Sequence, residues 1–160
     1  MKKNVIIVIV VFCLGILSLI FLGDNLFPFL DGDFPKNERD QDEKTFQART
    51  YTHIERESGF KLPPNAKGLN FYYWPPIDPG FAAKLRIPFE SKAQLITQIE
   101  KIQNTGNAIF TPVGARQKWW ISENAKIILE RKVENGSSYF LIFLVEEGED
   151  LILYLEYSVI

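Results

Sequence analysis

A long apolar segment near the N-terminus constrains this 160-residue chain more than any other feature. Val5–Leu22 contains eighteen residues without a charge, and fifteen of them are Val, Ile, Leu or Phe. As an α-helix, a segment of this length reaches about 27 Å, close to the roughly 30 Å hydrocarbon thickness of a bilayer. A buried helix in a soluble core would need apolar neighbours on every side, which the remaining residues scarcely supply. The segment is therefore predicted to cross a membrane.

The charges beside the apolar segment predict its orientation. Lys2 and Lys3 precede it, whereas three aspartates and no base lie between Gly23 and Lys36. Because Lys and Arg stay on the cytoplasmic side, we expect the N-terminus inside and the rest of the chain outside. A cleaved signal peptide is the alternative, but its apolar region would be shorter and followed by a small-x-small cleavage site. An uncleaved signal anchor is the favoured interpretation.

Composition limits the chemistry and the partners of the outer portion. After Gly23 the chain carries all twenty acidic residues and sixteen of the eighteen basic ones, a formal charge of −4. The bases are not clustered, so a nucleic-acid-binding surface is not expected. The only cysteine, Cys13, lies inside the predicted span, which leaves no thiol outside for a disulfide or a cysteine-based zinc site. No cofactor or metal is predicted, and a thiol-free outer domain suits a bacterial envelope.

Three parts are predicted along the chain. Residues 1–23 form the signal anchor, residues 24–44 form a juxtamembrane segment and the start of a helix, and residues 45–160 form one extracytoplasmic α+β domain. The motif Asp31-Gly32-Asp33 is interpreted as a turn, because the further ligands of a calcium loop are missing.

Hydrophobic periodicity predicts a small antiparallel sheet of five or six strands with two helices packed on one face. The first helix is expected over Asn37–Ser58, because this stretch lacks Gly and Pro and Gly59 follows it. A second helix is expected to begin at Ser91 and end at Gly106. Short connections indicate a meander. The expected strands are Leu69–Trp74, Phe81–Phe89, Trp119–Ser122, Lys126–Val133, Tyr139–Val145 and Leu151–Val159.

The only histidine, His53, lies on the first predicted helix with Arg49 and Glu57 one turn away on either side. In a functional interpretation, His53 acts as a general base oriented by Glu57 or as a metal ligand. A solvent-facing ladder of ion pairs is favoured, because two ligands are too few for zinc and no nucleophile motif accompanies them. A hydrolase would need His53 in a cleft beside an acid from another element, and Asp78 and Glu123 are the first candidates.

Aromatic side chains gather at two places and provide the candidate binding residues. Tyr72 and Trp74 share one side of a predicted strand, and Trp119 and Trp120 are neighbours before another strand. Exposed Trp and Tyr side chains stack on sugar rings or anchor a protein partner. Packing at the open end of a small sheet is the more common role, because large aromatic side chains bury most of their area.

These patterns favour a membrane-anchored outer domain that binds another envelope protein or an envelope polymer without catalysis. A small hydrolase that uses His53 with a carboxylate is one alternative. An inhibitor or immunity-type protein is another, in which the acidic run Glu146–Asp150 would mask a basic site.

Overall fold

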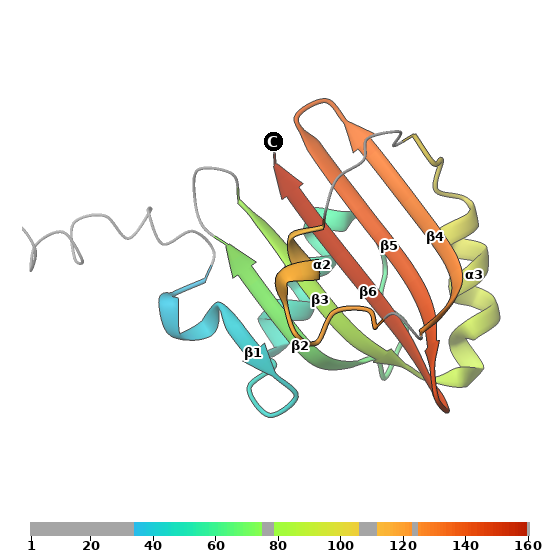
Figure 1. Ribbon diagram of the computed structural model, residues 1–160, viewed down its shortest axis with the longest axis horizontal. Helices are drawn as coiled ribbons and strands as arrows, with labels where there is room; N and C mark the ends of the chain where they lie inside the picture. The colour runs from blue at the N-terminus through green and yellow to red at the C-terminus, as the bar shows by residue number, and fades with distance from the viewer. Residues whose placement is uncertain (1–33, 75–78, 106–111, 123–124, 160) are drawn as a thin grey trace, which may run out of the picture. The chain divides into compact units, whose positions relative to one another are not determined.

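The computed structural model describes residues 34–74, 79–105, 112–122 and 125–159, all within one compact unit (Figure 1). The predicted span Val5–Leu22 and the turn at residues 31–33 lie outside these ranges. No helix within the described ranges has the length and apolar character needed to cross a bilayer. In chain order the elements are η2 (Lys36–Glu38), β1 (Asp40–Asp42), α2 (Ala48–Ser58), β2 (Lys67–Trp74), β3 (Gly80–Ile87), η3 (Phe89–Ser91), α3 (Lys92–Glu100), η4 (Val113–Arg116), β4 (Lys126–Asn135), β5 (Ser138–Glu147) and β6 (Asp150–Val159).

Six strands form one antiparallel sheet in the order β1-β2-β3-β6-β5-β4. This confirms the predicted α+β fold with an antiparallel sheet and two α-helices. The simple meander was wrong, because β3 is followed by α3 and the chain then reaches the far edge at β4. The last three strands return from that edge and end with β6 paired to β3. Two three-stranded halves therefore meet at the centre of the sheet.

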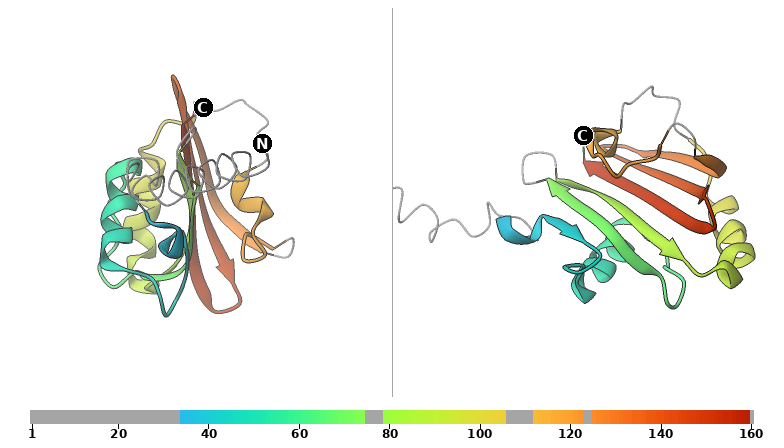
Figure 2. Two further views of the ribbon diagram at one scale, coloured as in Figure 1. Left: turned by 90° about the vertical axis from the view of Figure 1, so that its left-hand side faces the viewer. Right: turned by 60° about the horizontal axis from the view of Figure 1, so that its bottom comes forward.

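Both α-helices cover the same face of the sheet, which we call the helix face (Figure 2). Ile54 of α2 and Leu95 and Ile99 of α3 are fully buried there. Apolar side chains from every second strand position form the facing layer, as expected of a strand with one side against helices. The buried strand residues of this face are Phe71, Tyr73, Phe81, Ala83, Leu85, Ile87, Phe140, Ile142, Leu144, Leu151, Leu153 and Leu155.

The first helix begins at Ala48, eleven residues later than predicted, and the charged stretch before it forms η2 and β1. The Asp42 carboxylate accepts hydrogen bonds from the backbone N–H groups of Lys44 and Thr45, at 2.9 and 3.0 Å, and from the Thr45 hydroxyl. This local turn competes with helix formation at that point. The helix ends as predicted at Gly59, whose φ of 63° few other residues adopt readily.

Residues 112–122, here called the covering segment, lie over the opposite face of the sheet, which we call the second face (Figure 2). The strand predicted at Trp119–Ser122 is absent, because this part of the segment forms turns. Among these turns, the N–H of Trp120 donates to the Gln117 carbonyl at 3.1 Å. Trp119, Trp120 and Ile121 pack against the sheet. Their buried partners on the strands are Tyr139, Leu141, Phe143, Val145, Ile152 and Tyr154.

Candidate functional site

Tyr72 and Trp74 lie on the second face, on the side of β2 that points away from the helices. Their rings are neighbours, with centroids 6.2 Å apart, and both side chains are half-buried. The Trp74 indole lies over Gly80 of β3, where an added Cβ would come within 2.4 Å of the ring. Tyr72 is in register with Ala82, another small residue of β3. Small neighbours on β3 therefore leave room for both rings on this face of the sheet.

Trp119 and Trp120 come to the same face but are held by the covering segment itself. The Trp120 indole lies on Gly114, where an added Cβ would come within 2.6 Å of the ring. Its ring also meets the edge of Tyr154 at a centroid distance of 5.2 Å, and Trp119 lies 5.8 Å from Trp120. Both tryptophans are half-buried and form part of the second apolar cluster. The four predicted residues thus share one face, as two separate ring pairs.

A buried carboxylate, which was not among the residues predicted from the sequence, fixes the covering segment to the sheet. Glu156 of β6 is fully buried. It accepts hydrogen bonds from the backbone N–H groups of Val113 and Gly114, at 2.8 and 2.7 Å. The Tyr139 hydroxyl also donates to Glu156. Three donors therefore surround this one side chain, and two of them belong to the first turn of η4. Their hydrogen bonds compensate much of the cost of burying the carboxylate.

Burial governs the protonation of this group. It raises the pKa of the Glu156 carboxyl above its usual range, against the opposing effect of the hydrogen bonds from Tyr139, Gly114 and Val113. Burial and the adjacent Glu156 carboxylate also raise the pKa of the Tyr139 hydroxyl, so this phenol remains a hydrogen-bond donor at physiological pH. The site therefore consists of one acid surrounded by donors.

The raised pKa predicts a pH dependence of stability. Between the usual carboxyl value and the raised one, the folded chain binds more protons at Glu156 than the unfolded chain does. The contribution of this group is therefore present below the usual carboxyl pKa of about 4 and is lost as the pH rises through the raised pKa of Glu156. We expect the free energy of unfolding of the wild type, minus that of Glu156→Gln, to fall across this range in urea titrations. A flat or rising difference would contradict the assignment.

A second, partly buried polar group lies on the same face as Glu156. Lys84 donates to Glu147 at 2.8 Å, and the Tyr154 hydroxyl also donates to Glu147. The ammonium of Lys84 lies 5.2 Å from the centre of the Tyr154 ring. Burial, followed by the hydrogen bond to Glu147, raises the pKa of the Tyr154 hydroxyl. These residues tie β3, β5 and β6 together on the second face.

His53 does not belong to this site, and the prediction that it faces solvent was wrong. Its side chain is only 7% exposed and points to the helix face. The imidazole lies 4.9 Å from the Phe34 ring and 5.7 Å from the Tyr73 ring, and its Nδ1 is 3.0 Å from the guanidinium of Arg56. Glu57 pairs with Arg56 at 2.6 Å. The acids suggested as partners of His53, at positions 78 and 123, lie outside the described residues.

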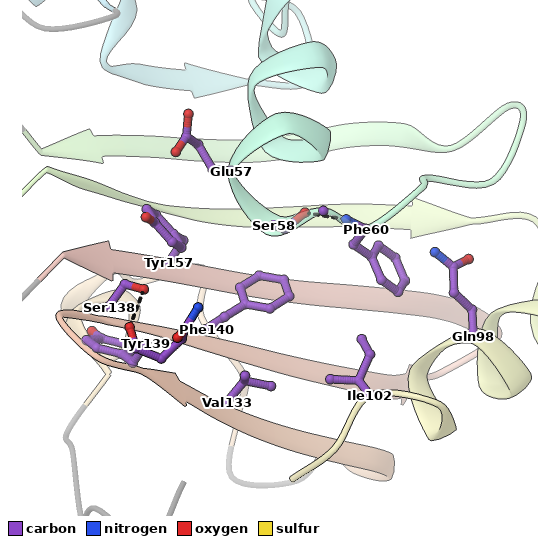
Figure 3. A pocket seen from close by; sticks show the side chains of 12 residues that line it. Glu57, Ser58, Phe60, Gln98, Ile102, Val133, Ser138, Tyr139, Phe140 and Tyr157 are labelled. Carbon is purple, nitrogen blue, oxygen red and sulfur yellow. Dashed lines mark hydrogen bonds between the residues drawn. The ribbon is translucent and has the colours of Figure 1, made fainter. Parts of the chain in front are cut away.

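A groove of about 270 Å³ opens on the helix face between the C-terminal ends of α2 and α3 and the β4–β5 hairpin (Figure 3). Phe60 and Phe140 face each other across it, with Ile102 and Val133 along one side. Its lining comes from four distant parts of the sequence, so no local pattern indicates it. Within the described ranges, no three His, Cys, Asp or Glu side chains lie close enough together to hold a metal ion.

The chain was compared with protein-family descriptions, with curated proteins and with solved structures, and none of the three comparisons gave a match. Any functional assignment therefore rests on the residues of this chain alone.

Proposed function

We propose that this protein is a single-pass membrane-anchored domain on the outer side of the membrane, and that it binds an envelope protein or envelope polymer without catalysis. The membrane part rests on the apolar segment Val5–Leu22 and the flanking Lys2 and Lys3. The binding part rests chiefly on one observation: the Tyr72 and Trp74 rings stand side by side on the second face above the small residues of β3. Partly exposed Trp and Tyr side chains are the typical anchors of a binding surface.

The edges of the sheet support binding through a face rather than by strand addition. At one edge, β1 has only three residues, and two of them are aspartates. At the other edge, Thr105 accepts from the N–H of Glu134 at 2.9 Å and donates its own N–H to the Lys132 carbonyl at 3.0 Å. Asn104 accepts from the N–H of Lys132 at 2.9 Å. Covered or very short edges are a common protection against pairing with another strand.

Site-specific photocrosslinking in cells tests this proposal. A photoreactive phenylalanine analogue placed at Tyr72, or at the exposed Lys118 of the covering segment, is expected to capture an envelope protein or polymer. The same analogue at Gln94, which is exposed on α3, serves as the matched control for the helix face. Mass spectrometry identifies the adducts. Identical adducts from all three positions would contradict a binding role for the second face.

Membrane anchoring is tested separately. The intact chain is expected to stay in the membrane pellet after extraction at alkaline pH. Protease added outside spheroplasts is expected to digest the domain without opening the cells. Recovery of the full-length chain in the soluble fraction would overturn the anchor.

A further inference from the structure

One ionisable side chain, Glu156, joins the backbone of the covering segment to the sheet. We propose that residues 112–122 open from the second face as a unit, and that a proton on Glu156 holds them closed. When Glu156 loses this proton, the covering segment opens more readily and uncovers apolar side chains of β5 and β6. This regulatory device depends neither on the membrane anchor nor on the proposed binding partner.

The covering segment has internal contacts that keep its shape. The N–H groups of Ala115, Gln117 and Trp120 donate to carbonyls of the segment itself, at 3.0, 2.8 and 3.1 Å. The Trp120 indole packs on Gly114, which belongs to the same segment. None of these contacts has to break when the segment leaves the sheet. Such a segment is suited to local opening at a lower free energy than the unfolding of the whole domain.

The attachment of the covering segment to the sheet is of two kinds. In the part of the chain that the structure describes, the backbone hydrogen bonds of the segment to the sheet come from Val113 and Gly114, and both end on Glu156. The other attachment is the packing of residues 119–121 on apolar side chains of β5 and β6 (Figure 2). Apolar packing carries no proton, so the bonds to Glu156 are the part of the attachment that responds to pH.

The strand register identifies the groups that surround Glu156 on the second face. Ala82 of β3 and Leu141 of β5 lie directly opposite it. The hydroxyls of Tyr139 and Tyr154 have raised pKa values, so both keep their protons at physiological pH. The next residues of β3, β5 and β6 on the same side of the sheet are Gly80, Lys84, Tyr139, Phe143, Tyr154 and Ser158.

The charged groups near Glu156 are bonded elsewhere or exposed. Lys84 donates to Glu147 at 2.8 Å. Arg116 and Lys118 of the covering segment are exposed. Among the described residues, Glu156 therefore has hydrogen-bond donors around it but no cation paired with it. An ionised Glu156 under the closed segment lacks a compensating charge, which favours the protonated form there.

Opening changes the surroundings of this carboxyl group. In the closed state, burial raises the pKa of Glu156 more than its hydrogen bonds lower it. In the open state water reaches the carboxyl group, and its pKa returns toward the usual value of about 4. Between these two values the closed state binds more protons than the open state. The opening constant therefore rises with pH in this interval, by up to about tenfold for each pH unit.

Hydrogen exchange of the full-length chain in detergent tests this proposal. Exchange is followed from about pH 4 to about pH 8, and each rate is divided by the intrinsic rate of the same amide, which gives the opening constant. At Val113 and Gly114 the wild-type constant is expected to rise with pH by up to about tenfold per unit and then to level off. Glu156→Gln cannot ionise, so its constant should be the same at every pH. Glu149→Gln, which changes an exposed acid, is the matched control and should keep the wild-type rise.

A second variant keeps the carboxyl group in place. Tyr139→Phe removes a hydrogen bond that lowers the pKa of Glu156. The opening constant of this variant should therefore still rise with pH, and it should level off at a higher pH than in the wild type. A wild-type constant that does not change with pH would overturn the proposal without any variant.

Amides of the helix face, at Ile54 and Leu95, distinguish local opening from unfolding of the whole domain. Opening constants at Val113 and Gly114 that equal those of the helix face would show that the covering segment leaves the sheet only in global unfolding, and would overturn its opening as a unit. An equal rise with pH in the wild type and in Glu156→Gln would overturn control by the Glu156 proton.

Discussion

Glu156→Ala is expected to lower the free energy of unfolding by about 3–5 kcal/mol, one of the two largest single-residue effects that this structure predicts. Truncation leaves the N–H groups of Val113 and Gly114 without their acceptor in a buried environment. An unsatisfied buried donor costs about 1–3 kcal/mol, and the cavity left by the side chain adds to that cost. For a domain with a total stability of roughly 5–15 kcal/mol, this is a large fraction. Urea titration of the full-length chain in detergent measures the change.

The loss of stability in Glu156→Ala should also be largest in the covering segment, because the Glu156 carboxylate holds this segment to the sheet. In hydrogen-exchange mass spectrometry we expect the Glu156→Ala variant to lose protection first in residues 112–122. Protection of the helix face around Ile54 and Leu95 should fall only with global stability, because those residues belong to the other cluster.

Two further variants serve as controls. Glu149→Ala removes an exposed acid from the turn before β6 and is expected to change stability by no more than about 0.5 kcal/mol. Tyr139→Phe removes one of the three donors to Glu156 but leaves both backbone bonds, so an intermediate loss is expected. If Glu156→Ala were as mild as Glu149→Ala, the buried carboxylate would not hold the covering segment.

Much of the fold could be predicted because local patterns and tertiary packing agree there. The strand Phe81–Phe89 alternates apolar and charged residues, and β3 has the same alternation, with Leu85 and Ile87 buried on the helix face. Gly59 is typical of a helix end in the sequence, and it adopts the left-handed conformation that this role requires. In such segments the period of the sequence is enough to identify the element.

The errors occur where distant contacts override local pattern. The stretch around Trp119 and Trp120 resembles a strand in sequence, but Trp120 packs on Gly114 and the segment is held by Glu156, which follows 42 residues after Gly114. His53 has charged neighbours one turn away, which favours a solvent-facing position, yet its ring packs against Phe34, which lies before the helix. Neither contact leaves a periodic signal.

The candidate site was predicted only in part. The shared orientation of Tyr72 and Trp74 follows from strand geometry, and the structure places both on one face. The role of Glu156 leaves one trace in the sequence, because it is the only charged residue between Leu151 and Val159. An isolated acid in an otherwise apolar strand indicates a buried polar contact. Its partners, however, come from a segment whose position no local pattern reveals.

Phe34→Ala is the second large effect, because Phe34 closes the helix-face core at the point where the chain joins the fold. Its ring contacts Phe71, Tyr73 and His53 at centroid distances of 5.0, 5.1 and 4.9 Å. The guanidinium of Arg49 lies 5.0 Å from the centre of the same ring. Removing a fully buried phenyl group is expected to cost about 3–5 kcal/mol.

A matched phenylalanine elsewhere in the chain makes this prediction sharp. Phe89 is 64% exposed, so Phe89→Ala should change the free energy of unfolding by no more than about 0.5 kcal/mol. Hydrogen exchange in Phe34→Ala should rise first in residues 34–42, since η2 and β1 are held to β2 through this corner. Equal stability losses in the two variants would show that the segment after the predicted anchor merely rests on the domain. A loss confined to Phe34→Ala would show that Phe34, the first of the described residues, is an integral part of the helix-face core.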